Sequence, residues 1–128
     1  MRLLLDTHVL IWMVEDPNRV SVQVTTLVKA STSEVFVSAA TGWEIATKTR
    51  LGKLKFDPTF LDDFEGRLRA LEIEPLAISV THAVAGGRIK GAPTDPFNRM
   101  LAAQSIVEGL TIATVDPALA ALGARVIW

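Results

Sequence analysis

The sequence predicts an α/β fold, a three-layer sandwich with a central and mainly parallel sheet. Short apolar runs that are rich in branched residues, such as residues 2–5 and 35–37, suit buried parallel strands. Longer segments with helical spacing of apolar residues separate these runs, as the crossovers between parallel strands require. The 128 residues contain no repeat, linker or low-complexity stretch, so we expect a single domain over residues 1–128.

The N-terminal part of the chain begins with a strand over residues 2–5 that ends abruptly at Asp6. The apolar residues after it follow helical spacing, which predicts a first helix directly behind the strand. Ser21 is a residue type that often starts helices, and it indicates a second helix over residues 21–30. Residues 35–37 then form the second predicted strand.

The middle of the chain predicts two helices and an edge strand. A third helix is expected over residues 43–51, where Gly52 ends it. A half-buried helix is expected over residues 59–71, because charged residues fall between apolar ones at helical spacing. Residues 73–76 indicate a short edge strand, since Pro75 is tolerated mainly at sheet edges.

The C-terminal third continues the alternation of helices and strands. Asp95 suits the N-cap of a helix and Pro96 suits its first position, so the most distinct helix begins there. The predicted elements are a helix from Ser79 to Gly86, a loop over 88–94, a helix from Asp95 to Val107, a strand over 110–114, a helical turn over 117–121 and a strand over 125–128.

Composition limits the classes to which the protein can belong. Hydrophobic residues make up 49% of the chain, so we expect a sheet covered on both faces together with apolar surface for a partner. The absence of cysteine excludes disulfides and thiolate metal sites and fits a cytoplasmic location. We expect no signal peptide and no membrane span. With a net charge of −1, nucleic-acid binding needs a local basic patch.

Acidic side chains follow three of the predicted strands. Asp6 follows the first strand, Glu44 the second and Asp116 the fourth. Neighbouring parallel strands would bring these carboxylates together at the sheet edge where ligands bind in such folds. Carboxylates gathered in this way need a counter-ion, and oxygen ligands favour Mg²⁺ or Mn²⁺ over zinc. Helix capping by Asp6 and a helix-dipole contact of Glu44 are the structural alternatives.

In these residues the chain resembles the PIN-domain ribonucleases, specifically VapC-type toxins of bacterial toxin–antitoxin pairs. The matching segments are LLLDTHVLIW at 3–12, VFVSAATGWEIATKTRLGKL at 35–54, DPFNRMLAAQSIVEGLTIATVD at 95–116 and the terminal VIW. The resemblance implies a PIN-like sandwich with an acidic pocket for Mg²⁺ or Mn²⁺. It also implies endonucleolytic cleavage of RNA, neutralisation by a small antitoxin, and a homodimer.

The resemblance can be carried over to individual positions. Asp6, Glu44 and Asp116 match acidic pocket positions of the family, and Thr7 and Thr114 match small polar residues that line the pocket. The fourth acidic position differs. The family motif usually reads DPFDR, whereas this chain reads DPFNR, so Asn98 stands where an aspartate is expected. An amide oxygen can coordinate a cation but brings no charge, and we therefore expect weaker metal binding and lower activity.

The sequence hypothesis is metal-assisted phosphodiester hydrolysis. Asp6, Asp116 and Asn98 would hold the cation, which lowers the pKa of a bound water and offsets charge on the phosphate. Glu44 would bind a second ion or orient the attacking water. Basic residues near these acids are the expected RNA phosphate contacts: Lys48, Arg50, Lys53, Lys55, Arg88, Lys90 and Arg99.

Two other functions compete with this hypothesis. Phosphatases that work through an aspartyl-phosphate also begin with a strand followed by an aspartate. Those enzymes have a second acidic residue two positions later, where this chain has His8. The other alternative is a catalytically inactive PIN domain that binds RNA or an antitoxin, which Asn98 makes a serious candidate. His8 and His82 are isolated in the sequence, which argues against a histidine-based site.

Overall fold

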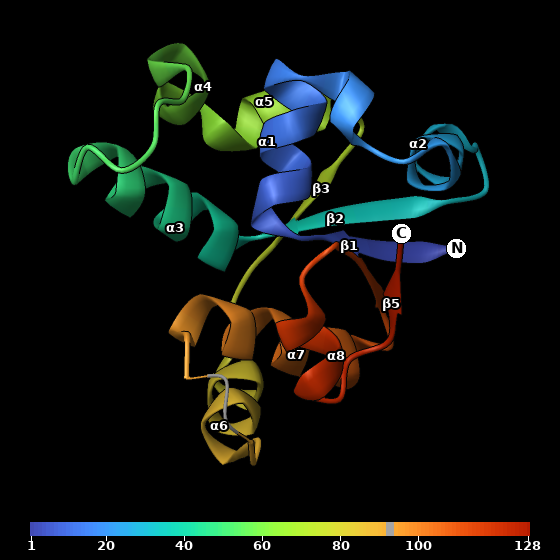
Figure 1. Cartoon of the computed structure of the whole chain (residues 1–128), viewed down its shortest axis with the longest axis vertical. Coiled ribbons are helices and arrows are strands. Elements are labelled where there is room, and N and C mark those ends of the chain that lie inside the picture. The colour runs from blue at the N-terminus through green and yellow to red at the C-terminus, as the bar shows by residue number, and fades with distance from the viewer. Residues whose placement is uncertain (92–93) are drawn as a thin grey trace.

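The computed structural model describes residues 1–91 and 94–128. Residues 92–93, which belong to the loop expected over 88–94, lie outside the described residues. The structure confirms the α/β class, with a central parallel sheet between layers of helices (Figure 1). No helix in the described parts of the chain has the length and apolar character needed to span a bilayer.

The sheet has β1 at its centre. Its strands are β1 (Arg2–Leu5), β2 (Glu34–Ser38), β3 (Glu74–Leu76), β4 (Thr111–Ala113) and β5 (Val126–Ile127), in the order β3-β2-β1-β4-β5. All four pairings are parallel, with Leu4 of β1 level with Phe36 of β2 and Ile112 of β4. The carboxyl ends of β2, β1 and β4 are therefore neighbours. As predicted, the strand that contains Pro75 is at the edge.

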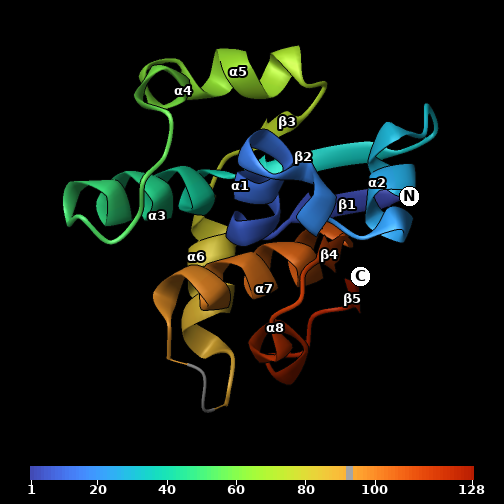
Figure 2. The same ribbon diagram turned by 45° about the horizontal axis from the view of Figure 1, so that its top comes forward.

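Helices cover both faces of the sheet (Figures 1 and 2). One layer contains α1 (Thr7–Glu15), α2 (Val22–Lys29), α4 (Pro58–Asp62) and α5 (Phe64–Ala70). The opposite layer contains α6 (Val80–Arg88), α7 (Pro96–Glu108) and α8 (Pro117–Ala121). Helix α3 (Ala39–Arg50) leaves the carboxyl end of β2, and a 3₁₀ turn over Pro17–Arg19 joins α1 to α2.

The core is divided by the sheet into two apolar clusters. Successive side chains of a strand point to opposite faces, so Leu5 and Val35 join the cluster under α1 and α2. Leu4 and Ile112 face the other way and pack with Leu101 of α7. This arrangement explains the continuous apolar character of the β1 segment.

Two predicted helices differ from the structure. The helix expected over residues 59–71 is two helices, α4 and α5, because the backbone of Asp63 is not helical (φ −139°, ψ 60°) and its carboxylate accepts from the Gly66 amide at 3.2 Å. The third helix begins at Ala39 rather than Trp43, since the Ser38 hydroxyl caps it by accepting from the Ala40 amide at 3.0 Å. The small residues after β2 are thus helical.

Candidate functional site

Asp6 lies where β1 becomes α1, and it has two roles there. Its Oδ1 accepts the Thr7 amide at 2.7 Å, which makes it the N-cap of α1. Its Oδ2 accepts the hydroxyl of Thr114, at the end of β4, also at 2.7 Å. The carboxylate is therefore held from two neighbouring strands, and the side chain is only 4% exposed. The capping alternative is correct, but it uses only one of the two oxygens.

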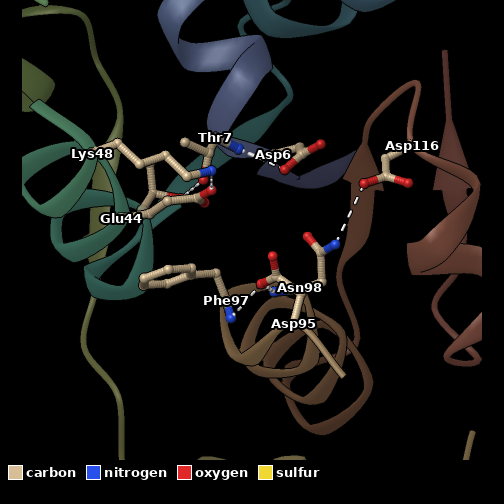
Figure 3. A network of polar contacts seen from close by, with 9 residues as sticks. Asp6, Thr7, Glu44, Lys48, Asp95, Phe97, Asn98 and Asp116 are labelled. Atoms are coloured by element: carbon tan, nitrogen blue, oxygen red, sulfur yellow. Dashed lines mark hydrogen bonds and ion pairs between the residues drawn. The ribbon is translucent and has the colours of Figure 1, made fainter. Parts of the chain in front are cut away.

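A chain of polar contacts connects Asp6 to Asn98. The Asp116 amide donates to the Thr114 hydroxyl oxygen at 2.9 Å, so Thr114 joins the two aspartates. One Asp116 oxygen caps α8 by accepting from the Ala118 amide. Its other oxygen accepts from the Asn98 side-chain nitrogen at 3.4 Å. Figure 3 shows the Asn98 amide with its nitrogen toward Asp116 and its oxygen toward the side of Asp6 and Glu44.

Asp95 is bound to its own helix. Its Oδ1 accepts from the amides of Phe97 at 2.8 Å and Asn98 at 3.1 Å, which confirms that it caps α7. Asp95 is exposed, whereas Asp6 and Thr114 are buried. The cap fixes the first turn of α7, from which Asn98 reaches Asp116.

Glu44 lies on α3, faces the site and forms an ion pair with a lysine. Its side chain is 7% exposed, and the Lys48 ammonium donates to its Oε2 one turn along the same helix (Figure 3). Because α3 starts at Ala39, Glu44 lies in its second turn, so the expectation that it complements the dipole from the first turn is wrong. A short α1–α3 contact joins the buried hydroxyls of Thr7 and Thr41 at 3.0 Å.

Burial controls the electrostatics of Asp6. Desolvation raises the pKa of its carboxyl above the ordinary value, while the hydrogen bonds from Thr114 and Thr7 oppose the shift. Of the nearby charged groups, His8 lowers this pKa, and Glu44 raises it by a smaller amount. An ionised Asp6 is thus a partly uncompensated buried charge, which a cation would stabilise.

The donor set fits a hard divalent cation. Asp6 and Asp116 supply carboxylate oxygens and Asn98 supplies an amide oxygen, the ligand types that Mg²⁺ and Mn²⁺ prefer. Among the described residues, no three acidic, histidine or cysteine side chains lie close enough together to hold an ion as they stand. Asp6, Asp116 and Asn98 form a group linked through Thr114, and Glu44 faces this Thr114-linked group from α3 (Figure 3).

The predicted RNA contacts fall into different environments. Arg50, Lys53 and Lys55 are exposed at the end of α3 and just beyond it, and Arg88 and Lys90 are exposed at the end of α6. Lys48 is bound to Glu44. The guanidinium of Arg99 donates to the carbonyls of Gly86 and Ile89, so it holds α7 against the end of α6.

Two side-chain contacts in the structure could not be predicted from the sequence. Trp43 and Phe97 come before Glu44 and Asn98 in the chain, and their rings meet edge to face with centroids 4.9 Å apart. Helical spacing alone could not pair them, because they lie on different helices. His82 was expected to be isolated, but its Nε2 bonds to the Glu108 carboxylate at 2.7 Å. This pair joins α6 to α7 and lies away from Asp6 and Asp116.

The sequence model of the PIN domain family matches residues 3–124 of the chain. Among curated protein sequences, none matches the chain significantly.

Several solved structures share the fold. One is VapBC2 from Rickettsia felis, crystallised with a DNA fragment from its promoter, at a TM-score of 0.70 and 15% identity over 99% of this chain and 98% of that one. VapBC-1 from nontypeable Haemophilus influenzae has a TM-score of 0.63 and 16% identity, covering 99% of this chain and 97% of the other. FitAcB from Neisseria gonorrhoeae has a TM-score of 0.60 and 22% identity, covering 98% and 96%.

Proposed function

Because the chain belongs to the PIN domain family, we propose that it is a divalent-metal-dependent endoribonuclease and the toxin of a type II toxin–antitoxin pair. The observation that supports this best is the site at the ends of β1 and β4. There the Asp6 carboxylate accepts from the Thr114 hydroxyl, and that hydroxyl oxygen accepts from the backbone amide of Asp116. Glu44 faces these residues from α3. This is the edge of an α/β sheet at which ligands bind.

Asp6, Asp116 and Asn98 are the residues that would hold the cation. A bound Mg²⁺ or Mn²⁺ would supply charge that stabilises the attacked phosphate and would lower the pKa of a coordinated water. The protein fixes the ligands in advance: Asp6 is held by Thr7 and Thr114. Such positioning lowers the cost of organising charge when phosphate binds.

Glu44 has a different role in this proposal. It is bound to Lys48 and is not part of the Thr114-linked group. We assign it the orientation of the attacking water, from which it would accept a proton, a contribution that amounts to about 10²–10⁴-fold in rate. Binding of a second ion at Glu44 is the other possibility.

Asn98 favours one alternative function, an inactive PIN domain that binds RNA or an antitoxin. Its amide brings no charge to the site, and its side-chain nitrogen donates a hydrogen bond to an oxygen of Asp116 at 3.4 Å. Both effects reduce the negative charge available to a cation. An aspartate at this position would repel Asp116 instead and would free that oxygen for a metal.

The partners belong to the proposal as well. The solved relatives named above include complexes of VapB with VapC and of FitA with FitB, and a similar antitoxin would neutralise this chain. We further propose that the chain acts as a homodimer on RNA. The exposed cations Arg50, Lys53, Arg88 and Lys90 would contact phosphates.

A cleavage assay of the native chain beside Asn98→Asp tests this function. Asn98→Asp should raise Mn²⁺ affinity in calorimetry and the rate of RNA cleavage by about tenfold or more, since changes even beyond the direct ligands alter metal affinity by about 10–100-fold. Asp6→Asn is the negative control and should cleave no RNA. If Asn98→Asp bound metal but cut no RNA, the inactive-domain alternative would be favoured, and retained cleavage by Asp6→Asn would refute the metal site.

A further inference from the structure

An exposed tryptophan lies beside the acidic site. Trp43 is 61% exposed, although its neighbours in α3, Glu44 and Ile45, are buried. Large aromatic side chains usually bury most of their surface, so an exposed ring at this place needs an explanation.

Trp43 is held in position by α7. The Phe97 ring meets it at 4.9 Å with an interplanar angle of 71°. Phe97 is itself fixed, because its amide donates to the capping carboxylate of Asp95. Figure 3 shows the Phe97 ring extending from α7 toward α3, on the side of Glu44 and Lys48. An edge-to-face contact supports the indole while most of its surface stays open to solvent.

A hollow lies against the same tryptophan. It has a volume of about 500 Å³ and is lined by Trp43, Phe64 and Leu68 on its apolar side, with Glu65 and Arg69 among its polar residues. This volume is within the range of small-molecule sites, which are mostly apolar with a few polar groups. The hollow could therefore receive one planar group stacked on the indole.

We propose that Trp43 stacks on a nucleobase of single-stranded RNA next to the phosphate that is cleaved, and that Phe97 positions the indole for this contact. The inference rests on the proposed ribonuclease function and adds its base-binding subsite. Every base has a π-face, so stacking on one aromatic side chain holds RNA without reading a particular sequence.

The surrounding charge favours a nucleotide over an apolar protein side chain. Arg50 is seven residues after Trp43, so it lies on the same face of α3 about 10 Å further along. It is exposed, and Lys53 follows just past the helix end. The combination of an aromatic ring with cations along one path is typical of single-strand binding grooves. Glu44, which would orient the water that attacks the phosphate, is the next residue after Trp43 in α3.

Binding of RNA by an uncleaving chain tests the proposal directly. In the Asp6→Asn background, anisotropy of a labelled single-stranded oligoribonucleotide gives the affinity. Trp43→Ala and Trp43→Leu should each lose roughly 5- to 150-fold, the effect of one stacked base. Trp43→Phe should keep most of the affinity, because it retains a ring. Leu51→Ala, at an exposed apolar position at the end of α3, is the matched control and should bind like the parent.

A spectroscopic measurement separates stacking from general effects on the fold. With Trp12 and Trp128 changed to Phe, the remaining emission comes from Trp43. The oligoribonucleotide should quench it, and an abasic strand of the same length should not. Circular dichroism of Trp43→Leu verifies folding.

The outcomes distinguish this proposal from the function on which it rests. Equal RNA affinity of the parent, Trp43→Ala and Trp43→Leu would overturn the stacking subsite, while cleavage by the native chain left the ribonuclease standing. The subsite would also be overturned if Trp43→Ala reduced only self-association in sedimentation. If the Asp6→Asn parent bound no RNA and the native chain cut none, both proposals would be overturned.

Discussion

Asp6 shows how a single side chain serves the fold and the candidate site together. One oxygen caps α1 and the other accepts from Thr114, so truncation of the side chain to alanine would remove both a helix cap and a contact between neighbouring strand ends. Burial of that charge opposes folding, as its raised pKa indicates. The residue is therefore well placed for metal chemistry and unfavourable for stability in the absence of a cation.

The pH dependence of stability tests this conflict. A carboxyl group with a raised pKa in the folded state contributes stability at low pH that is lost as the pH rises through that pKa. Without divalent ions, Asp6→Asn should therefore have a higher free energy of unfolding than the native chain at pH 7. The difference should shrink below about pH 3.9, where the unfolded carboxyl is protonated. Urea titrations in a chelator measure it, and a native chain at least as stable at pH 7 would contradict the prediction.

Asp95 provides a contrasting carboxylate whose role is local. Asp95→Ser keeps a capping oxygen and should retain both stability and Mn²⁺ affinity. Asp95→Ala should lower the free energy of unfolding by about 0.5–2 kcal/mol, the usual value of an N-cap. Thermal unfolding and calorimetry would check the pair, and a loss of metal affinity in a folded Asp95→Ser chain would place Asp95 among the ligands.

At the scale of elements, the sequence predicts strands and most helix starts but not interruptions by capping. The strand ends that carry Asp6 and Asp116 were predicted because apolar runs stop there abruptly. The break at Asp63 was missed, since apolar spacing continues through it while the carboxylate starts a new helix. The early start at Ser38 was missed for a similar reason, because small residues carry no periodic signal. Contacts between elements, such as Trp43 with Phe97, have no local signal at all.

His82 forms a contact between two helices that could not be predicted from the sequence. Its Nδ1 accepts from the Ser79 amide in a capping box at the start of α6, and its Nε2 bonds to Glu108 at the end of α7. His82→Ala should lower the free energy of unfolding by about 1–3 kcal/mol, at 0.5–1.5 kcal/mol for each hydrogen bond. His8→Ala, a matched change at an exposed histidine of α1, should alter it by less than about 0.5 kcal/mol. Similar values for both variants, measured by urea unfolding, would refute the assignment.

At the scale of the whole molecule, the sheet buries one stripe of the apolar residues on each helix and leaves others exposed. On α1, Val9 and Leu10 belong to the buried stripe. The exposed aliphatic residues lie elsewhere, with Val22 on α2 84% exposed and Val80 on α6 81% exposed. The surface available to a second chain is thus distributed over both layers, and its location depends on tertiary packing that helical spacing does not reveal.

Association of the isolated chain is the prediction at this scale. Sedimentation should give twice the 13.9 kDa mass of one chain, and titration with the protein encoded next to it should form a larger complex that no longer cuts RNA. The exposed valines would be covered in either state. A stable monomer that ignored its genomic neighbour would contradict both proposed partners.

The pairing of β1 with β4 also determines when, during synthesis, the site can exist. The hydroxyl that holds Asp6 belongs to a residue made 108 positions later. At about 5–20 residues per second, a ribosome reaches it roughly 5–20 s after Asp6 has been added. Until then β1 has only β2 beside it, and Asp6 lacks both the Thr114 hydroxyl and Asp116. If the chain is the ribonuclease proposed above, it would therefore stay harmless to the messenger and ribosome that produce it for most of its own translation.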